Sequence, residues 1–530
     1  MSLFSGLYVG VSGLQAGQNS LNTTAHNLAN VDTEGYVRQQ AYQATSDYTT
    51  ISIDYNSVGW QQYGTGVTFA ATRQVRDYFL DVSYRTESGR SAFYETSYNV
   101  LAEVEVVLGE LNEVAFQDSL DDLYTAIQEL SKEPDGAVTQ ALLVQTCSSF
   151  LERAQSVYSS LSSYQDNLNA SVISTTETIN AYGNQISLLN EQIRYIESAG
   201  VENANDLRDA RNQLLDELSA MVDIDVTETS TGAVTIKIEG EPFVTETNVY
   251  EMELYYDTVT GFATPFWPQN ASYSFDANGN KVYDISESGA VFDLTKTISS
   301  ALDTDIGSLK ATLLARGDHR ANYTDMLDAD TYNTEIAESV LMNVQAEFDQ
   351  LIHNVVTMIN DTLTEAGYPE MFQLVSGYEG EEIVEGNNSD TLFTTANIIM
   401  NEELVQEPTL LGFIKEDGSV DFETLEQLKE AFDDAAYTLN PNVLTQTNIM
   451  DYYSSLVSQV GNSGYVYKSV MEYQQQTVET VESARQSILG VSSDEELSNM
   501  VRFQNAYNAA SRYITTIDEM IEHIINTLGA

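Results

Sequence analysis

The sequence predicts a mainly α-helical chain with a β-rich insertion, in which the two terminal helices pair as a coiled coil. At both ends of the chain, large apolar residues recur at alternating spacings of three and four, as they do in helices with one apolar seam. The seven prolines all lie between Pro134 and Pro441, so no proline interrupts a helix at either end. At Val222 the apolar period changes from about 3.6 to 2, which predicts strands.

Each terminal helix carries a seam that we expect to be an assembly surface. A lone helix is marginal in water, so both seams need partners. The opposite end of the chain, neighbouring copies and other proteins all remain open as partners, as does an ordinary helical hairpin on a globular body. The N-terminal seam consists of Phe4, Leu7, Val11, Leu14, Leu21 and Leu28. The C-terminal seam consists of Phe503, Tyr507, Ala510, Ile514, Ile517, Ile521, Ile524 and Leu528.

A turn is expected directly after the first helix. Asn30 is predicted to be a left-handed C-terminal cap, and Gly35 supplies a positive φ. Arg38 follows the turn as a cation in a chain that has few. It pairs either with an acid of a neighbouring molecule or with one of its own chain, and the sequence leaves both open. The turn motif comprises Asn27, Asn30, Thr33, Gly35, Tyr36 and Arg38.

Three domains are predicted. Residues 1–50 and 488–530 form the terminal coiled-coil core. Residues 51–221 and 306–487 form an elongated helical bundle, with an irregular α/β segment near 367–448. Within it, we expect one long helix over 137–171 and a separate heptad helix over 179–196.

Residues 222–305 form a β-rich outer domain. Period-2 alternation on both sides of Ser230-Thr231-Gly232 predicts a hairpin. The segment Asp276–Asn280 contains Asn-Gly and predicts a second tight turn. It resembles a calcium loop only loosely, because Lys281 stands where an EF-hand needs glycine.

Composition excludes several classes of function. The chain has 22 Lys+Arg and 80 Asp+Glu, a net charge of −58, which disfavours nucleic acid and anionic membranes as partners. No apolar run is long enough to span a membrane, and the N-terminus lacks the features of a cleaved secretory signal.

Cys147 lies on an apolar stripe and is interpreted as buried. The four histidines are scattered, and no metal, cofactor or nucleophile motif is present, so we expect no enzyme.

The string from Asn27 to Tyr36 resembles the signature of the bacterial flagellar rod, hook and hook-associated proteins. Ser12-Gly13-Leu14 before it and Phe503–Tyr507 near the end match the same family. Inner segments, among them Gly35–Gln39 and Ile179–Ile193, are similar to the members that join hook to filament. The chain departs from that pattern with Val37 where Ser is common, Arg208 where an apolar residue is common, and Asn212 where an acid is common.

The resemblance implies a structural, non-enzymatic protein of the flagellum outside the cell. It would polymerise as a ring of identical subunits at the distal end of the hook, between the hook protein and a second hook–filament junction protein. It would leave the cell by flagellar type III export without a cleaved signal peptide. A cytoplasmic export chaperone would hold its C-terminal helix. The alternatives are another axial protein, of the hook or distal rod, or a secreted surface-binding protein with a coiled-coil anchor.

Overall fold

The computed structural model describes residues 3–53, 60–109, 116–200, 202–276, 279–285, 288–377 and 389–528. The side chains of residues 3, 51–53, 60, 61 and 528 lie outside that description. Contacts divide the chain into two compact units. The first contains Met1–Ser88, Ile179–Glu251 and Gln475–Ala530, and the second contains Gly89–Thr178 and Met252–Gln474. The division into three domains stays a prediction.

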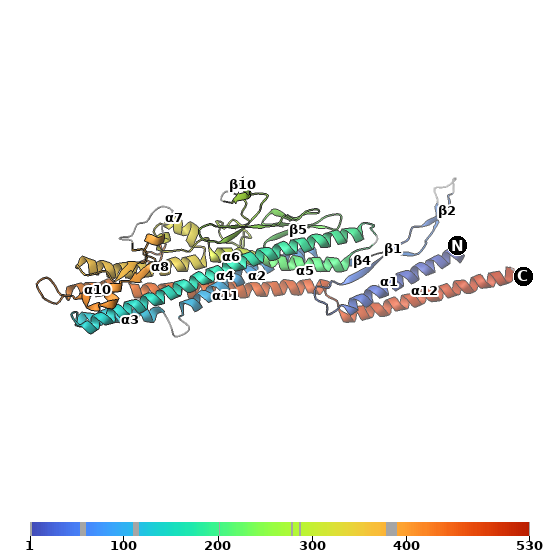
Figure 1. Ribbon diagram of the computed structural model, residues 1–530. Helices are drawn as coiled ribbons and strands as arrows, with labels where there is room; N and C mark the ends of the chain where they lie inside the picture. The colour runs from blue at the N-terminus through green and yellow to red at the C-terminus, as the bar shows by residue number, and fades with distance from the viewer. Residues whose placement is uncertain are drawn as a thin grey trace. The chain divides into compact units, whose positions relative to one another are not determined.

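In the first unit the two ends of the chain lie side by side. Helix α1 (Leu3–Ala29) packs along helix α12 (Ser493–Leu528), and the two run antiparallel, so that both chain ends lie at one end of the pair (Figure 1). The backbone of α12 starts one residue after Ser492, whose hydroxyl accepts the N–H of Glu495 at 3.4 Å. The predicted pairing of the terminal helices is confirmed.

Small sheets complete the first unit. Strand β1 (Gln39–Thr45) pairs antiparallel with β4 (Val67–Gln74), and β2 (Thr49–Ile53) pairs with β3 (Trp60–Tyr63). Helix α5 (Asn205–Met221) leads into a three-stranded antiparallel sheet of β5 (Ile224–Glu228), β6 (Val234–Ile238) and β7 (Glu241–Val244). The turn between β5 and β6 contains Gly232 at φ +83°, which confirms the hairpin predicted there.

The prediction of two separate helices over 137–171 and 179–196 is wrong. Helix α4 runs without a break from Ala137 to Glu197. The linking residues are rich in Thr and Ser, yet their hydroxyls bond back to the helix, as Thr176 Oγ1 does to the carbonyl of Val172 at 2.8 Å. Val172 and Thr176 are both buried, so packing offsets the modest helix propensity of this stretch.

The second unit is built around one helical core. Among the described residues, most of its core residues come from α2 (Tyr78–Leu108), α3 (Phe116–Lys132), α4, α8 (Val340–Glu365), α10 (Glu423–Asp433) and α11 (Ile449–Leu489). Phe116 lies at the centre, with its ring 5.0–5.5 Å from the rings of Phe150, Phe348 and Tyr453. Shorter helices are α6 (Ser308–Arg316), α7 (Ala329–Thr331) and α9 (Glu402–Gln406).

The described residues of the second unit form three two-stranded antiparallel sheets. They are β8 (Glu253–Tyr256) with β9 (Ala263–Phe266), β10 (Ser272–Phe275) with β11 (Lys281–Asp284), and β12 (Phe372–Leu374) with β13 (Ile398–Met400). The predicted turn over 276–280 joins β10 to β11, where the N–H of Asp276 donates to the carbonyl of Asn280 at 2.9 Å. Residues 277 and 278 of that turn lie outside the described residues.

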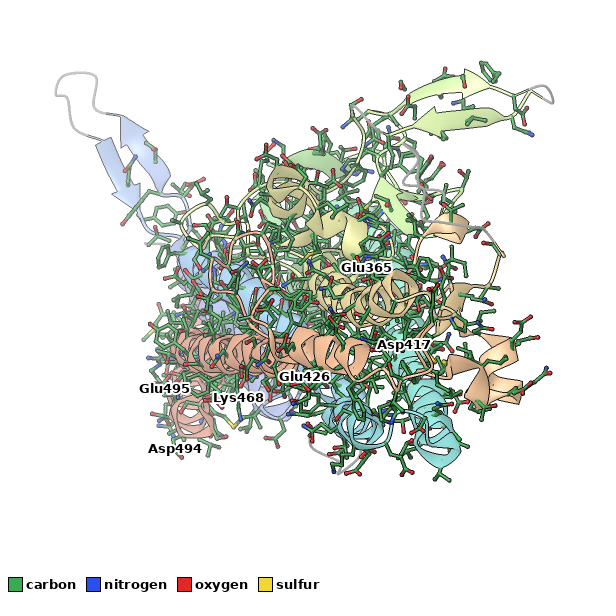
Figure 2. All side chains as sticks on the ribbon, turned by 90° about the vertical axis from the view of Figure 1, so that its left-hand side faces the viewer. Glu365, Asp417, Glu426, Lys468, Asp494 and Glu495 are labelled. Carbon is green, nitrogen blue, oxygen red and sulfur yellow. The ribbon has the colours of Figure 1, made fainter. Side chains whose placement is uncertain are left out.

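Acidic side chains cover the surface of each unit. Figure 2 labels Glu365, Asp417 and Glu426 in the second unit, and Asp494 and Glu495 at the start of α12. All five are exposed. Among the described helices, none is long and apolar enough to cross a membrane.

A buried carboxylate in the core of the second unit is bound by side-chain amides. Glu347 on α8 is fully buried, and side-chain amides bind its carboxylate, from Asn440 at 3.0 Å and Gln459 at 2.8 Å. Burial raises the pKa of Glu347 to about 7, and the two amide donors only partly oppose this.

Candidate assembly site

The face of α1 that contacts α12 is made of glycines. A Cβ built on Gly6 would lie 2.9 Å from Ile517 Cδ1, and one on Gly10 would lie 2.7 Å from Ile514 Cγ1. At Gly13 the nearest atom is Ala510 Cβ at 3.7 Å, and at Gly17 it is the backbone of Tyr507 at 3.4 Å. Spacings of four, three and four keep these glycines on one helical face. Four members of the predicted C-terminal seam therefore lie against glycine.

The large apolar residues of the N-terminal seam lie beside that contact face. Phe4 is 64 % exposed and Val11 39 %, and Leu7, Leu14, Leu21 and Leu28 are half-buried. Tyr8, between the first two, is 73 % exposed. These side chains are available to another molecule. Their role as an assembly seam stays a prediction.

On α12 the predicted seam is the more covered face. Ile517 is buried, and Phe503, Tyr507, Ala510, Ile514 and Ile521 are half-buried, whereas Ile524 near the end is exposed. The side chain of Leu528 lies outside the described side chains. Sequence reasoning missed the glycine stripe on α1, although its heptad spacing was visible in the sequence.

Asn27 organises the turn that follows α1. Its side-chain amide pairs with both backbone groups of Gln39: Nδ2 donates to the carbonyl at 2.8 Å, and Oδ1 accepts the N–H at 3.0 Å. The hydroxyl of Tyr36 donates to the same Oδ1 at 2.8 Å. Burial and the carboxylates of Asp206 and Asp209 raise the pKa of Tyr36, so this hydroxyl stays a donor. Asn27 thereby joins the end of α1 to the start of β1.

The prediction that Asn30 is a left-handed cap is wrong. Among the described residues, the non-glycine positions with positive φ are Glu239, Asp303 and Phe413. Asn30 instead turns its side chain back, and Nδ2 donates to the carbonyl of His26 at 3.0 Å. A side chain that satisfies the last helical carbonyls makes a left-handed residue unnecessary.

Two other positions of the motif shape the turn. Thr33 Oγ1 donates to Asn30 Oδ1 at 3.2 Å. Gly35 has φ +74°, as predicted. A tight backbone reversal thus brings the chain from α1 to β1 within nine residues of Asn30.

Arg38 pairs with acids of its own chain. Its Nε lies 2.9 Å from Glu496 and its Nη1 3.1 Å from Glu495, both in the first turn of α12. The side chain of Glu496 is only 3 % exposed. The backbone N–H of Arg38 also donates to the carbonyl of Leu489 at 2.9 Å. The residue therefore fastens the turn after α1 to the break between α11 and α12.

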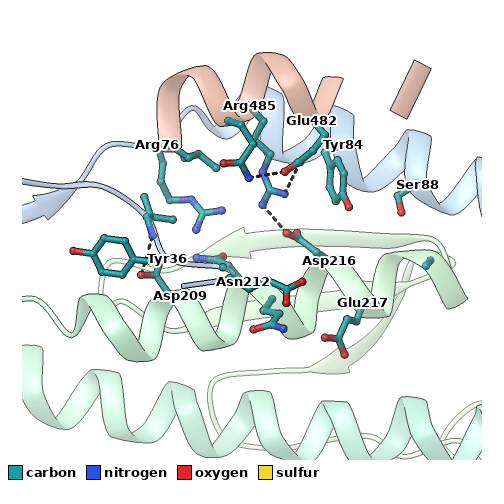
Figure 3. A pocket seen from close by; sticks show the side chains of 17 residues that line it. Tyr36, Arg76, Tyr84, Ser88, Asp209, Asn212, Asp216, Glu217, Glu482 and Arg485 are labelled. Atoms are coloured by element: carbon teal, nitrogen blue, oxygen red, sulfur yellow. Dashed lines mark hydrogen bonds and ion pairs between the residues drawn. The ribbon is translucent and has the colours of Figure 1, made fainter. Parts of the chain in front are cut away.

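A polar cavity of about 350 Å³ lies under this turn (Figure 3). Arg485 spans it, with ion pairs of 2.8 Å to Asp81 and 2.5 Å to Asp216. Burial alone would raise the pKa of Asp81, but Arg76 and Arg485 hold it below its usual value. Asp209 accepts the N–H of Val37 at 3.3 Å, and burial raises its pKa to about 7. These contacts connect α2, α5 and α11 to the turn.

Arg208, which departs from the resembled pattern, has a clear local role. Its Nε and Nη2 bind both carboxylate oxygens of Glu197 at 2.7 and 2.8 Å, and Nη1 binds Glu228 at 2.8 Å. A bidentate pair of this kind is geometrically specific. It fastens the end of α4 to the start of α5.

The reactive side chains are in structural positions. Cys147 is fully buried, and burial raises its pKa. His353 stacks on Tyr323 at 3.8 Å between ring centroids. His26 lies edge-on to Tyr36, and His523 is exposed. In the part of the chain that the structure describes, no group of three or more His, Cys, Asp and Glu side chains is placed to hold a metal ion.

Three family descriptions match segments of this chain. "Flagella basal body rod protein" matches residues 7–36, which include most of α1 and the turn after it. "Flagellar basal body rod FlgEFG protein C-terminal" matches 473–527, in α11 and α12. "Flagellar hook-associated protein FlgK helical domain" matches 101–369, half of the chain. The chain belongs to the FlgK family of flagellar hook-associated proteins.

Full-length relatives agree with the family. The chain is 27 % identical to "Flagellar hook-associated protein 1" of Bacillus subtilis, covering 100 % of this chain and 99 % of that one. It is 24 % identical to the proteins of the same name from Salmonella typhimurium and Escherichia coli, covering 97 % of this chain and 98 % of each. Its fold is similar to that of the flagellar hook junction protein FlgK from Burkholderia pseudomallei. That match has a TM-score of 0.55 at 11 % identity and covers 77 % of this chain and 100 % of that one.

Proposed function

We propose that the chain polymerises as a ring of identical subunits at the distal end of the hook and connects the hook mechanically to the filament. A place at the hook–filament junction of the bacterial flagellum follows from its family and its full-length relatives. The role is structural, with no catalytic step. The hook protein would lie below the ring and the second junction protein above it.

The observation that supports this proposal is that α1 has two separate faces, one of glycines and one of large apolar side chains. Because glycines take the contact with α12, the large side chains of Phe4, Tyr8 and Val11 remain outside the pair. An exposed apolar face on an ordered helix marks an interaction surface. In a ring, neighbouring subunits cover that face.

Electrostatics supports the same arrangement. Copies with a net charge of −58 repel one another, so packed copies need charge-free contact surfaces. Residues 1–31 contain no Asp, Glu, Lys or Arg. Helix α1 can therefore approach another copy without desolvating or opposing a charge.

Before export, in a chain whose α1 and α12 have not yet paired, the seam of α12 would be exposed. A cytoplasmic export chaperone bound there would prevent aggregation while the chain awaits type III export, which needs no cleaved signal peptide. The seam that such a chaperone would cover contains Ile514, Ile517 and Ile521.

Deletion of the gene in its parent bacterium tests the function. We expect electron microscopy to find bare hooks and an immunoassay to find flagellin in the medium. Absence of hooks would place the protein in the rod or hook instead. Intact filaments in a strain without a second copy of the gene would overturn the proposal.

Point variants separate the two faces of the terminal pair. Ile517→Asp puts a charge between α1 and α12 and should break the pair itself. Leu14→Asp lies on the half-buried flank, and we expect it to block incorporation while the second unit stays folded. Tyr273→Asp, an exposed residue on β10, is the matched control and should assemble normally. Normal junctions with Leu14→Asp would contradict the assembly role of the seam.

A further inference from the structure

An unfilled groove lies in the first unit, beside the end of α4. It consists of two adjoining hollows of about 520 and 730 Å³ that share Ile196 and Leu207. The larger hollow follows the last turns of α4, where Tyr195 is 83 % exposed and Ile196 is also exposed. Leu188, two turns earlier on the same face as Tyr195, is exposed as well. An apolar strip on α4 therefore lies open to solvent, and the hollow beside it is also lined by polar side chains, namely Glu191, Gln192, Arg194 and Ser198.

Hydrogen bonds and an ion pair within the chain fix the walls of the groove. Glu197 binds Arg208 through both carboxylate oxygens and also accepts the backbone N–H of Ala204 at 2.9 Å. Asn203 Nδ2 donates to the carbonyl of Thr72 on β4 at 2.8 Å. These bonds hold the end of α4, the start of α5 and β4 together, so the groove walls are fixed before anything enters.

The apolar face of α1 in the same molecule cannot fill this groove. The C-terminal half of α1 lines the smaller hollow through Asn22 and His26. Val11 and Phe4 lie 11 and 18 residues before Asn22 on a continuous helix, which is about 17 and 27 Å at 1.5 Å per residue. Both the exposed patch and the groove are thus left open within one chain.

Charge limits what can enter. The groove lies on a chain of net charge −58, which repels acidic segments, and residues 1–31 form the longest run without Asp, Glu, Lys or Arg in the sequence. Phe4, Tyr8 and Val11 are spaced four and three apart, so they form one helical face. An apolar helix face that enters a groove through residues at this spacing is a common recognition mode.

We infer that the groove around Tyr195, Ile196 and Leu207 receives the face formed by Phe4, Tyr8 and Val11 on α1 of a second copy of this chain. The inference rests on the proposed ring of identical subunits and names the receiving surface within it. Because the two surfaces are different patches of the same chain, the contact is head-to-tail, and such contacts form a ring when the rotation between neighbouring subunits closes.

Cysteine cross-linking in assembled flagella tests the inference. In a Cys147→Ser background, Tyr8→Cys and Tyr195→Cys would be placed in the same chain, and isolated hook–filament structures would be oxidised. A disulfide forms only when the two Cα atoms lie within about 7 Å. We expect disulfide-linked dimers and higher oligomers of this chain, because each subunit of a head-to-tail ring carries both cysteines and contacts two neighbours. The matched control, Tyr8→Cys with Tyr273→Cys, should give none, because Tyr273 is exposed but lies on β10.

Each cross-linking result either supports the second copy of this chain as the occupant of the groove or overturns that inference. Disulfide-linked dimers and higher oligomers with Tyr8→Cys and Tyr195→Cys, absent from each single variant, support the inference. If immunogold labelling places the protein at the junction and no disulfide-linked oligomer of this chain forms, the inference is wrong and the proposed function stands. A cross-link from Tyr195→Cys to a protein of another mass assigns the groove to that protein and also overturns the inference. Absence of the protein from the junction removes the proposed function, and the inference with it.

Discussion

The glycine face of α1 gives the sharpest prediction, because two neighbouring glycines differ in the space around them. A methyl group at Gly10 would lie 2.7 Å from Ile514 Cγ1 and 3.1 Å from Tyr513 Cδ1. At Gly13 the nearest atom is a methyl group at 3.7 Å, which is ordinary van der Waals contact. Gly10→Ala and Gly13→Ala are therefore the same chemical change on the same helix, with opposite steric consequences.

The magnitudes follow from helix propensity and overpacking. Alanine favours a helix interior over glycine by about 1 kcal/mol, and both variants gain this. Overpacking at Gly10 costs about 1–3 kcal/mol, because Cγ1 of a branched side chain must move or the helices must separate. We expect the terminal pair to be more stable in Gly13→Ala than in Gly10→Ala by about 1–3 kcal/mol, a factor of about 5–150 in the opening equilibrium.

Hydrogen–deuterium exchange of peptides from α1 and α12 measures that opening equilibrium directly. Gly13→Ala should slow exchange relative to the wild type, and Gly10→Ala should accelerate it relative to Gly13→Ala. Peptides from α8, in the second unit, serve as an internal control and should not change. Equal protection in both variants, or greater protection in Gly10→Ala, would refute the close packing of α12 on the glycine face.

Three further predictions concern the turn and the core. Asn27→Ala leaves both backbone groups of Gln39 without their buried partners, at about 1–3 kcal/mol each, and should accelerate exchange in β1; a wild-type rate there would contradict the role of Asn27. Arg38→Ala removes the ion-pair partner of the buried Glu496 carboxylate, so it should destabilise the start of α12 by about 3–5 kcal/mol. Adding Glu496→Gln should recover much of that loss, and a strictly additive double variant would count against the pair. Burial raises the pKa of Glu347 to about 7 in the folded chain, against 4.5 in the unfolded chain. The contribution of Glu347 to the free energy of unfolding is therefore fully present below pH 4.5 and is lost as the pH rises to 7. Glu347→Gln should remove this loss, on the order of 3 kcal/mol, and urea unfolding of both proteins at pH 5 and pH 8 would detect it; parallel pH profiles would contradict it.

The sequence by itself determined the helical ends, the β-rich insertion and the family. Heptad spacing and the absence of proline are local properties, and they suffice to predict that α1 and α12 are helices. The hairpins at Gly232 and at 276–280 were predicted for the same reason, because turn chemistry is local. The C-terminal seam was also visible in the sequence, because large apolar residues, among them Ile514 and Ile517, recur along it at heptad spacing.

Tertiary structure decided which faces meet. The sequence indicated large apolar residues as the contact face of α1, but the helices approach most closely where α1 has no side chain, and that depends on the partner helix. Only the structure shows that Arg38 binds Glu495 and Glu496, more than 450 residues away, because periodicity contains no information on long-range ion pairs. Likewise, the amide of Asn30 reaches His26, which removes the need for a left-handed cap. Buried packing also decides whether a Thr-rich stretch such as 172–178 breaks a helix or continues it. Residues whose neighbours come from their own helix or turn were predictable, and residues whose neighbours come from distant segments were not.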